Sequence, residues 1–209
     1  MKKKVVHVAV LVALGALMMG TASASFLVSS VGNFGDPNAV FEQQFTYDPS
    51  MGNLLVIQTY GYGGSSNAPG GTNVTGTVIA AGGFDPIIAL YSGAIGAGGA
   101  QIAGNDDQGS SPTNVPCGPG SGALSAGNCF DSRLVFNNLA TGTYTVALAV
   151  FGNTPPGTEN GAYPGNTTFG ERTAAFAIDV VAAPEPITSM LLGSGLLAVA
   201  FLARRKRRS

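Results

Sequence analysis

Large apolar residues alternate with small or polar ones along much of the central chain, in short runs separated by Gly, Pro, Asn and Asp. Successive side chains of a β-strand point to opposite faces of the sheet, so a period of two predicts a strand with one buried face. We expect three such sets of residues to face a hydrophobic core. They are Phe41, Phe45 and Tyr47; Tyr144, Val146, Leu148 and Val150; and Phe176, Ile178 and Val180.

The candidate strands lie between residues 41 and 181, at 41–47, 53–60, 76–80, 85–93, 100–104, 133–139, 142–152 and 173–181. Residues 53–60 are almost continuously apolar, which is typical of a central strand. No segment has a convincing amphipathic helical period. Many short strands bounded by turn residues predict an all-β fold, here an antiparallel β-sandwich of jelly-roll type. The longer loops, 61–75, 105–130 and 153–171, are where we expect a ligand to bind.

The N-terminal residues 1–24 have the layout of a secretory signal peptide. Lys2, Lys3 and Lys4 form a positive start, an apolar stretch follows, and Ala22-Ser23-Ala24 is a small-residue cleavage site. The alternative is a retained N-terminal anchor, which the short apolar stretch and the cleavage site disfavour. We expect the exported chain to begin near Ser25.

The C-terminal end combines an uncharged stretch, residues 187–203, with a basic cluster at 204–208. As a helix this stretch would span roughly 26 Å, slightly less than the ~30 Å hydrocarbon core. We expect one transmembrane helix here, with the basic cluster held in the cytoplasm by the positive-inside rule. The stop-transfer residues are Arg204, Arg205, Lys206, Arg207 and Arg208. The body, residues 25–183, would then lie outside the cytoplasmic membrane as one exported domain.

Pro184, Glu185 and Pro186, followed by this apolar stretch and basic end, resemble the PEP-CTERM sorting signal of Gram-negative bacteria. The resemblance covers residues 184–209. It implies recognition by an exosortase, a membrane enzyme thought to cut near the motif and to pass the protein to the cell surface. It also implies a connection with exopolysaccharide.

The body is acidic, with ten carboxylates against only Arg133 and Arg172, a net charge of −8. Nucleic acid is therefore not an expected partner, because phosphate binding needs clustered Lys or Arg. Residues 25–183 also contain no His and no Lys. This excludes a Ser-His-Asp triad, a Cys-His pair, a Ser-Lys dyad and His-based zinc sites. A carboxylate pair, as in glycosidases, stays open, but no spacing singles one out, and we do not expect an enzyme.

The two cysteines, Cys117 and Cys129, lie in a Gly- and Ser-rich segment. Export would place them in an oxidising compartment, where an even pair predicts a disulfide. The alternative is a pair of reduced thiols. Closing so short a loop would contribute about 3 kcal/mol in the chain-entropy description.

Residues 81–181 resemble a family of PEP-CTERM proteins called DVUA0089 and, more loosely, the bacterial pre-peptidase C-terminal domain, a small β-sandwich. The resemblance is carried by "AGGFDPIIALYSG", "AGNDDQG", "CFDSRLVFNNLATGTYTVALAVFGN" and "RTAAFAIDV". Neither family brings a catalytic motif that can be placed on this chain. Pre-peptidase domains are accessory modules, some of which bind calcium or polymers.

Four aspartates, Asp85, Asp106, Asp107 and Asp131, each lie beside the end of a predicted strand. If the strands pair as the resemblance implies, these carboxylates converge and could bind Ca²⁺, which takes about six to eight oxygen ligands. Further ligands could come from Asn105, Gln108 and loop carbonyls. The alternative is turn chemistry, since Asp before Pro and an Asn-Asp-Asp run both suit tight turns.

The sequence therefore favours an exported, C-terminally anchored, non-catalytic protein of the cell surface or extracellular matrix, processed by an exosortase. A Ca²⁺-dependent module that binds carbohydrate or another polymer is the second hypothesis. A secreted hydrolase with two catalytic carboxylates is the third.

Overall fold

The computed structural model describes residues 24–62, 71–107 and 130–184. Several predicted features fall outside these residues. They are the signal peptide up to residue 23, the disulfide between Cys117 and Cys129, Glu185 and Pro186 of the sorting motif, the transmembrane stretch 187–203 and the basic cluster 204–208. Within the described part of the chain, no helix has the length and apolar character needed to cross a membrane.

The described chain consists of strands joined by loops, with one short 3₁₀ turn, η1 (Pro49–Met51). The strands are β1 (Ser25–Asn33), β2 (Phe41–Tyr47), β3 (Leu54–Tyr60), β4 (Gly71–Thr72), β5 (Val78–Ile79), β6 (Pro86–Ser92), β7 (Gln101–Asn105), β8 (Arg133–Asn137), β9 (Gly142–Val150) and β10 (Ala175–Ala183).

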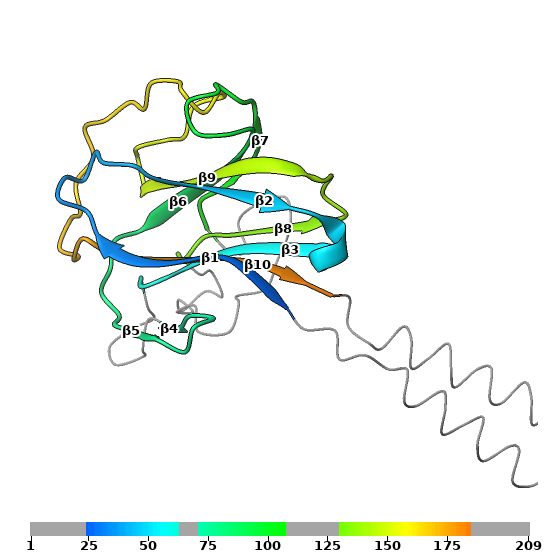
Figure 1. The fold of residues 1–209 in the computed structure, drawn as a ribbon. Coiled ribbons are helices and arrows are strands. Elements are labelled where there is room, and N and C mark those ends of the chain that lie inside the picture. Colours follow the sequence, from blue (N-terminus) through cyan, green and yellow to red (C-terminus); the bar gives the residue numbers. More distant parts are fainter. Residues whose placement is uncertain (1–23, 63–70, 108–129, 185–209) are drawn as a thin grey trace, which may run out of the picture.

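The longer strands form two antiparallel sheets, with strand orders β1-β10-β3-β8 and β2-β9-β6-β7 (Figure 1). We call them the β10 sheet and the β9 sheet. Strands β4 and β5 form a separate small hairpin. The all-β, antiparallel prediction is confirmed. The strand order, with chain neighbours repeatedly placed in opposite sheets, fits the predicted jelly-roll-like sandwich.

One hydrophobic core takes side chains from both sheets. Leu55, Ile57 and Ile178 come from the β10 sheet, whereas Ile88 and Leu148 come from the β9 sheet, and all five are fully buried. The alternating residues singled out in the sequence all lie in this core or pack against it. The period of two thus identified the inner face of strands β2, β9 and β10 correctly.

The predicted runs correspond to β2, β3 and β5 to β10, but β1 and β4 were not predicted. Strand β1 has the sequence SFLVSSVGN, in which serine and glycine interrupt the apolar residues. A register shift between Phe26 and Val28 further breaks its alternation, because a bulge moves the following side chains to the other face. Strand β1 exists because it pairs with β10 along nearly its whole length.

The outer face of the β10 sheet is divided into a covered half and a partly exposed half. In the covered half, Ser29, Asp179, Gln58 and Arg133 follow one another across the four strands. The backbone N–H of Val74 donates to Asp179 Oδ2 at 2.8 Å. The Nδ2 of Asn73 also donates to Ser29 Oγ at 3.3 Å. These bonds hold the β4–β5 hairpin over the polar half of the face.

Strand β10 ends where β1 begins, since Ser25 lies opposite Ala182. The 3₁₀ turn η1 closes against the same end of the sheet, which is visible in Figure 1. Gly52, directly after η1, has a φ of +141°, and a side chain built there would lie 2.5 Å from the carbonyl carbon of Ala183. The chain therefore leaves the domain at Pro184 through a tightly packed end.

Candidate metal centre

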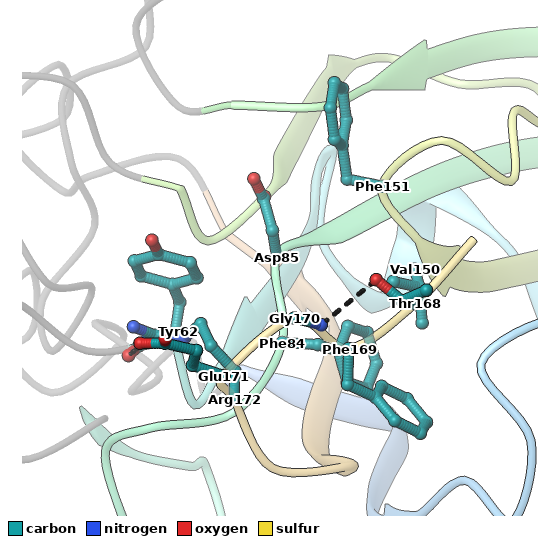
Figure 2. Close-up of a pocket in the computed structure, with 10 residues that line it drawn as sticks. All are labelled: Tyr62, Phe84, Asp85, Val150, Phe151, Thr168, Phe169, Gly170, Glu171 and Arg172. Atoms are coloured by element: carbon teal, nitrogen blue, oxygen red, sulfur yellow. Dashed lines mark hydrogen bonds between the residues drawn. The ribbon is translucent and has the colours of Figure 1, made fainter.

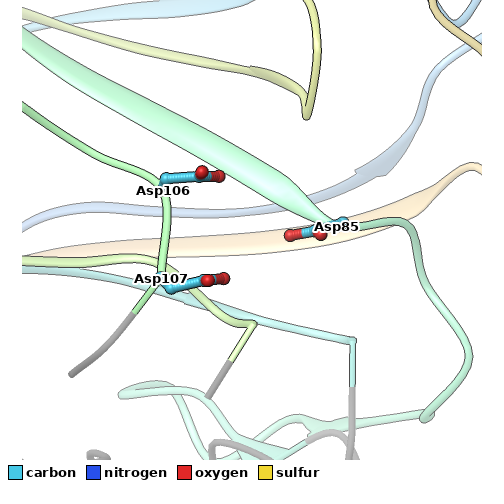
Figure 3. Close-up of side chains that lie close together, drawn as sticks. All are labelled: Asp85, Asp106 and Asp107. Atoms are coloured by element: carbon cyan, nitrogen blue, oxygen red, sulfur yellow. The ribbon is translucent and has the colours of Figure 1, made fainter. Parts of the chain in front are cut away.

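Three of the four predicted aspartates meet at one point of the β9 sheet (Figure 3). Asp85 directly precedes β6, and Asp106 and Asp107 directly follow β7. Strands β6 and β7 are antiparallel, with Ile88 opposite Asn105, so the start of one lies beside the end of the other. One carboxylate oxygen from each aspartate lies within 4.8 Å of the others. Oxygens bound to one Ca²⁺ at about 2.3–2.6 Å can be separated by this distance.

The fourth aspartate, Asp131, is 1% exposed and is held by the protein itself. Its Oδ1 accepts from the backbone N–H of Tyr62 and from Thr59 Oγ1, both at 3.3 Å. It is not among the three aspartates that form the cluster within the described residues. The charge of Asp131 also contributes to the raised pKa of Asp85. Its role as a direct ligand stays a prediction.

Ser132 and Asn105 fix the backbone around the cluster. Ser132 is fully buried, and its Oγ lies 2.6 Å from the carbonyl oxygen of Pro86 and within hydrogen-bonding distance of the Asp106 carbonyl. Asn105 Oδ1 accepts from the Arg133 backbone N–H at 2.9 Å, and its Nδ2 donates to the Asp107 carbonyl at 3.2 Å. Asn105 thus positions the backbone that carries Asp106 and Asp107. A further role of its amide oxygen as a metal ligand stays a prediction.

The cluster concentrates negative charge in a partly buried place. Asp85 Oδ1 and Asp106 Oδ1 are both buried, and no donor from the described residues reaches either of them. Burial and the neighbouring Asp107 and Asp106 raise the pKa of Asp85 to about 7. Burial and Asp107 raise the pKa of Asp106 to about 6, and burial raises the pKa of Asp107. Buried carboxylate oxygens without donors fit a hard cation, for which oxygen is the preferred ligand.

The raised pKa values predict that stability depends on pH when no metal is bound. A carboxyl group whose pKa is higher in the folded protein binds its proton more tightly there, so protonation favours the folded state. This contribution is fully present below the ordinary value of 3.8 and is lost as the pH rises through about 6 and 7. In the presence of a chelator, we expect the thermal unfolding midpoint to decrease as the pH is raised from about 5 to about 8. Thermal melts across this range measure it, and a midpoint that rises with pH would contradict the assignment.

A hollow of about 540 Å³ adjoins the cluster and shares Asp85 with it (Figure 2). Its apolar wall includes Phe84, Phe169 and the half-exposed Phe151, and its polar groups include Thr168. Pockets for small ligands typically measure about 300–1,000 Å³ and combine apolar walls with a few polar groups. A ligand in this hollow would lie beside Asp85, one of the three clustered aspartates.

One wall of the hollow is fixed by Arg172. Its guanidinium lies 3.5 Å from the centre of the Tyr62 ring. Arg172 Nε donates to the Gly83 carbonyl at 2.6 Å, and a terminal nitrogen donates to the Tyr62 carbonyl. Phe130 packs against the same ring, with centroids 4.6 Å apart. Tyr62, which follows β3, is thereby held between the loops that carry Arg172 and Phe130.

Sequence reasoning found the three clustered aspartates but missed the residues that position them. Ser132 has no signal of its own, because its importance comes from carbonyl groups 26 and 46 residues away in the chain. The wall formed by Phe84 and Phe169 was also missed, since contacts between separate loops leave no periodic pattern.

Comparison with known proteins gives one match. Residues 182–208 match the family model of the PEP-CTERM protein-sorting motif. The match begins within the last two residues of β10 and extends through the predicted transmembrane stretch and basic cluster. No curated protein and no solved structure matches the chain.

The matched motif defines the class of signal that the chain carries. It supports a PEP-CTERM protein, and it implies export, membrane-associated sorting in Gram-negative bacteria and processing by an exosortase. The resemblance of residues 81–181 to DVUA0089 proteins and pre-peptidase domains is not confirmed by any of these matches.

Proposed function

We propose that this chain is an exported, non-catalytic protein of the cell surface or extracellular matrix, anchored at its C-terminus until an exosortase processes it in connection with exopolysaccharide. The observation that carries the proposal is the sorting motif at residues 182–208. The jelly-roll-like β-sandwich is the exported cargo, and residues 1–24 are its signal peptide. Residues 187–203 form the transmembrane anchor, and the basic cluster that follows stays in the cytoplasm.

Three features support this proposal. The motif begins directly at the end of β10, so the folded domain and the sorting signal are adjacent and do not overlap by more than two residues. The body lacks His and Lys, so catalytic triads and dyads that depend on these residues cannot form within it. The anchor also has the charge asymmetry that sets orientation in a membrane.

Replacing Pro184, Glu185 and Pro186 together by alanine is expected to block processing in a Gram-negative host that has an exosortase. The parent protein should appear at the cell surface with a mass below that of the chain beginning at Ser25. The triple variant should stay in the membrane at full mass. Pro164→Ala, a change at an exposed proline of the body, is the control and should be processed normally. Equal processing of the triple variant and the parent would refute the role of the motif.

A second candidate function, a Ca²⁺-dependent module that binds carbohydrate or another polymer, is favoured by the aspartate cluster. In this role Asp85, Asp106 and Asp107 would hold the ion, and the adjoining hollow would receive the polymer. Apolar aromatic walls beside hydrogen-bonding groups are suited to sugar rings, which have both apolar faces and hydroxyl groups.

Purified exopolysaccharide of the host is the probe for this second function. We expect it to retain the protein in the presence of Ca²⁺ and to release it in EGTA. Mg²⁺ should not replace Ca²⁺, because Mg²⁺ demands a tighter octahedral shell and gives up its water reluctantly. Retention that is the same in Ca²⁺ and in EGTA would exclude a Ca²⁺-dependent site, and no retention in either would exclude this polymer as the ligand.

A further inference from the structure

An apolar row lies on the outer face of the β10 sheet. It occupies the half of that face nearest to Pro184, where the chain leaves the domain. Phe26, Val181, Val56 and Val135 follow one another across the four strands. Leu54, opposite Ala183, extends the row toward the end of the sheet. We call these five residues the exit patch.

The side chains of the exit patch point away from the core. Their chain neighbours Leu55, Ile57, Leu134, Val180 and Ala182 are all buried in the core, and successive residues of a strand point to opposite faces. Phe26 is 58% exposed, and the other four residues are partly exposed. By contrast, Asp179 and Gln58 in the next row are 1% and 5% exposed. On the two inner strands, β10 and β3, the outer face is thus more exposed at the apolar row than at the polar row.

This arrangement reverses the usual preference, in which polar residues remain in water and apolar ones are covered. Single exposed apolar residues are ordinary, but a contiguous apolar patch on one face is typical of a surface that another body covers. The length of chain beyond the domain indicates which body this is. Three residues, 184–186, join Ala183 to the uncharged stretch that begins at Ile187. Even when fully extended, this link reaches roughly 14 Å.

A bilayer has an interfacial region of roughly 5–7 Å on each side of its hydrocarbon core. With Ile187 at the edge of that core, so short a link places the exit end of the β10 sheet at the lipid surface. We propose that the exit patch docks on the outer surface of the membrane that the C-terminal stretch enters, with Phe26 inserted among the lipid head groups. This inference rests on the anchor proposed above.

Docking by the exit patch is apolar in origin. Within the described chain, the basic residue next to the patch is Arg133, which is only partly exposed. Asp48, directly before η1, adds an acidic group at the same end of the domain. Attraction to anionic lipids therefore contributes little, and added salt should not release the domain from the surface. The patch fixes the orientation of the anchored domain, so the β9 sheet with its aspartate cluster faces away from the membrane.

The chain contains no tryptophan, so a single substitution provides a specific fluorescent reporter. Phe26→Trp places the reporter in the exit patch. Ile102→Trp is the matched control, because Ile102 is a 41% exposed apolar residue on β7 of the opposite sheet. Both variants are made in the exported chain, which begins at Ser25 and keeps the C-terminal stretch, and are reconstituted in vesicles of phosphatidylethanolamine and phosphatidylglycerol, with or without brominated phosphatidylcholine.

We expect the emission of Phe26→Trp to shift to shorter wavelength on reconstitution and to be quenched by the brominated lipid, at low and high salt alike. The emission of Ile102→Trp should stay unquenched. Co-flotation of the protein with vesicles tests the anchor separately. Failure to float refutes the proposed anchor and this inference with it. If the protein floats but Phe26→Trp is not quenched, or if both reporters are quenched equally, docking alone is refuted. An emission of Phe26→Trp that is already shifted to shorter wavelength without lipid indicates that a second copy of the chain, and not the membrane, covers the patch.

Discussion

Replacing Asp85 by asparagine is expected to raise the unfolding midpoint of the metal-free domain and to abolish its response to Ca²⁺. The substitution removes one of three converging negative charges, and its amide can donate a hydrogen bond to a neighbouring carboxylate. We expect a gain of about 1 kcal/mol, a value already reduced for solvent screening because Asp85 is only partly buried. In a domain of this size the gain corresponds to roughly 2–4 °C.

The same substitution removes a metal ligand, so the effect on the Ca²⁺-bound protein has the opposite sign. At a free Ca²⁺ concentration of about 100 times the dissociation constant, binding stabilises the parent by about 2.7 kcal/mol. This corresponds to a rise of roughly 5–10 °C, which EGTA should reverse and Asp85→Asn should lose. Thermal melts of both proteins in Ca²⁺ and in EGTA measure these shifts.

Glu171→Gln is the matched control for Asp85→Asn, because Glu171 is an exposed carboxylate that lines the same hollow but lies outside the cluster. It should keep the full response to Ca²⁺. If Asp85→Asn instead lowers the midpoint in EGTA, and the parent does not respond to Ca²⁺, Asp85 serves the turn before Pro86 and the metal centre is refuted.

Gly52→Ala is expected to destabilise the domain by about 3 kcal/mol. A non-glycine residue at a positive φ costs roughly 1–2 kcal/mol, and the added methyl group would lie 2.5 Å from the carbonyl carbon of Ala183. Forcing extra volume into a packed site costs typically another 1–3 kcal/mol or so. The unfolding midpoint should fall by roughly 6–12 °C, as thermal or urea denaturation would measure.

Gly76→Ala separates the two contributions. Gly76 also has a positive φ, +81°, but nothing lies within 4 Å of the position its side chain would take. This variant should therefore lose only the smaller, conformational part. If Gly52→Ala and Gly76→Ala lose the same stability, the end of the domain at Ala183 is not too tightly packed to accept a methyl group.

Much of the fold could be predicted because the core-facing residues of most strands alternate with small or polar ones. Tyr144 to Val150 and Phe176 to Val180 identify the inner faces of β9 and β10 without reference to any other residue. Strand β1 could not be predicted in this way, because its serines and its bulge hide the pattern and its stability comes from a partner about 150 residues away. Strand β4, only two residues long, is equally dependent on the hairpin that contains it.

The candidate site was only half predictable for a related reason. Aspartates beside strand ends can be recognised in a sequence, and Asp85, Asp106 and Asp107 do converge. Whether a fourth carboxylate joins them depends on its hydrogen bonds, and Asp131 is held by Tyr62 and Thr59. Likewise, the exposed row of the exit patch is defined by cross-strand register, which pairs Phe26 with Val181 and is not contained in any single run of residues.

The position of β10 between β1 and β3 has a consequence for the time at which the domain folds. In the export proposed above, strand β1 would be the first part of the body to cross the membrane and β10, its neighbour in the sheet, the last. The β10 sheet thus lacks an inner strand throughout translocation, and such long-range pairing is intrinsically slow. Folding is completed only when the sorting motif itself reaches the membrane, so closure of the domain and delivery of its processing signal coincide.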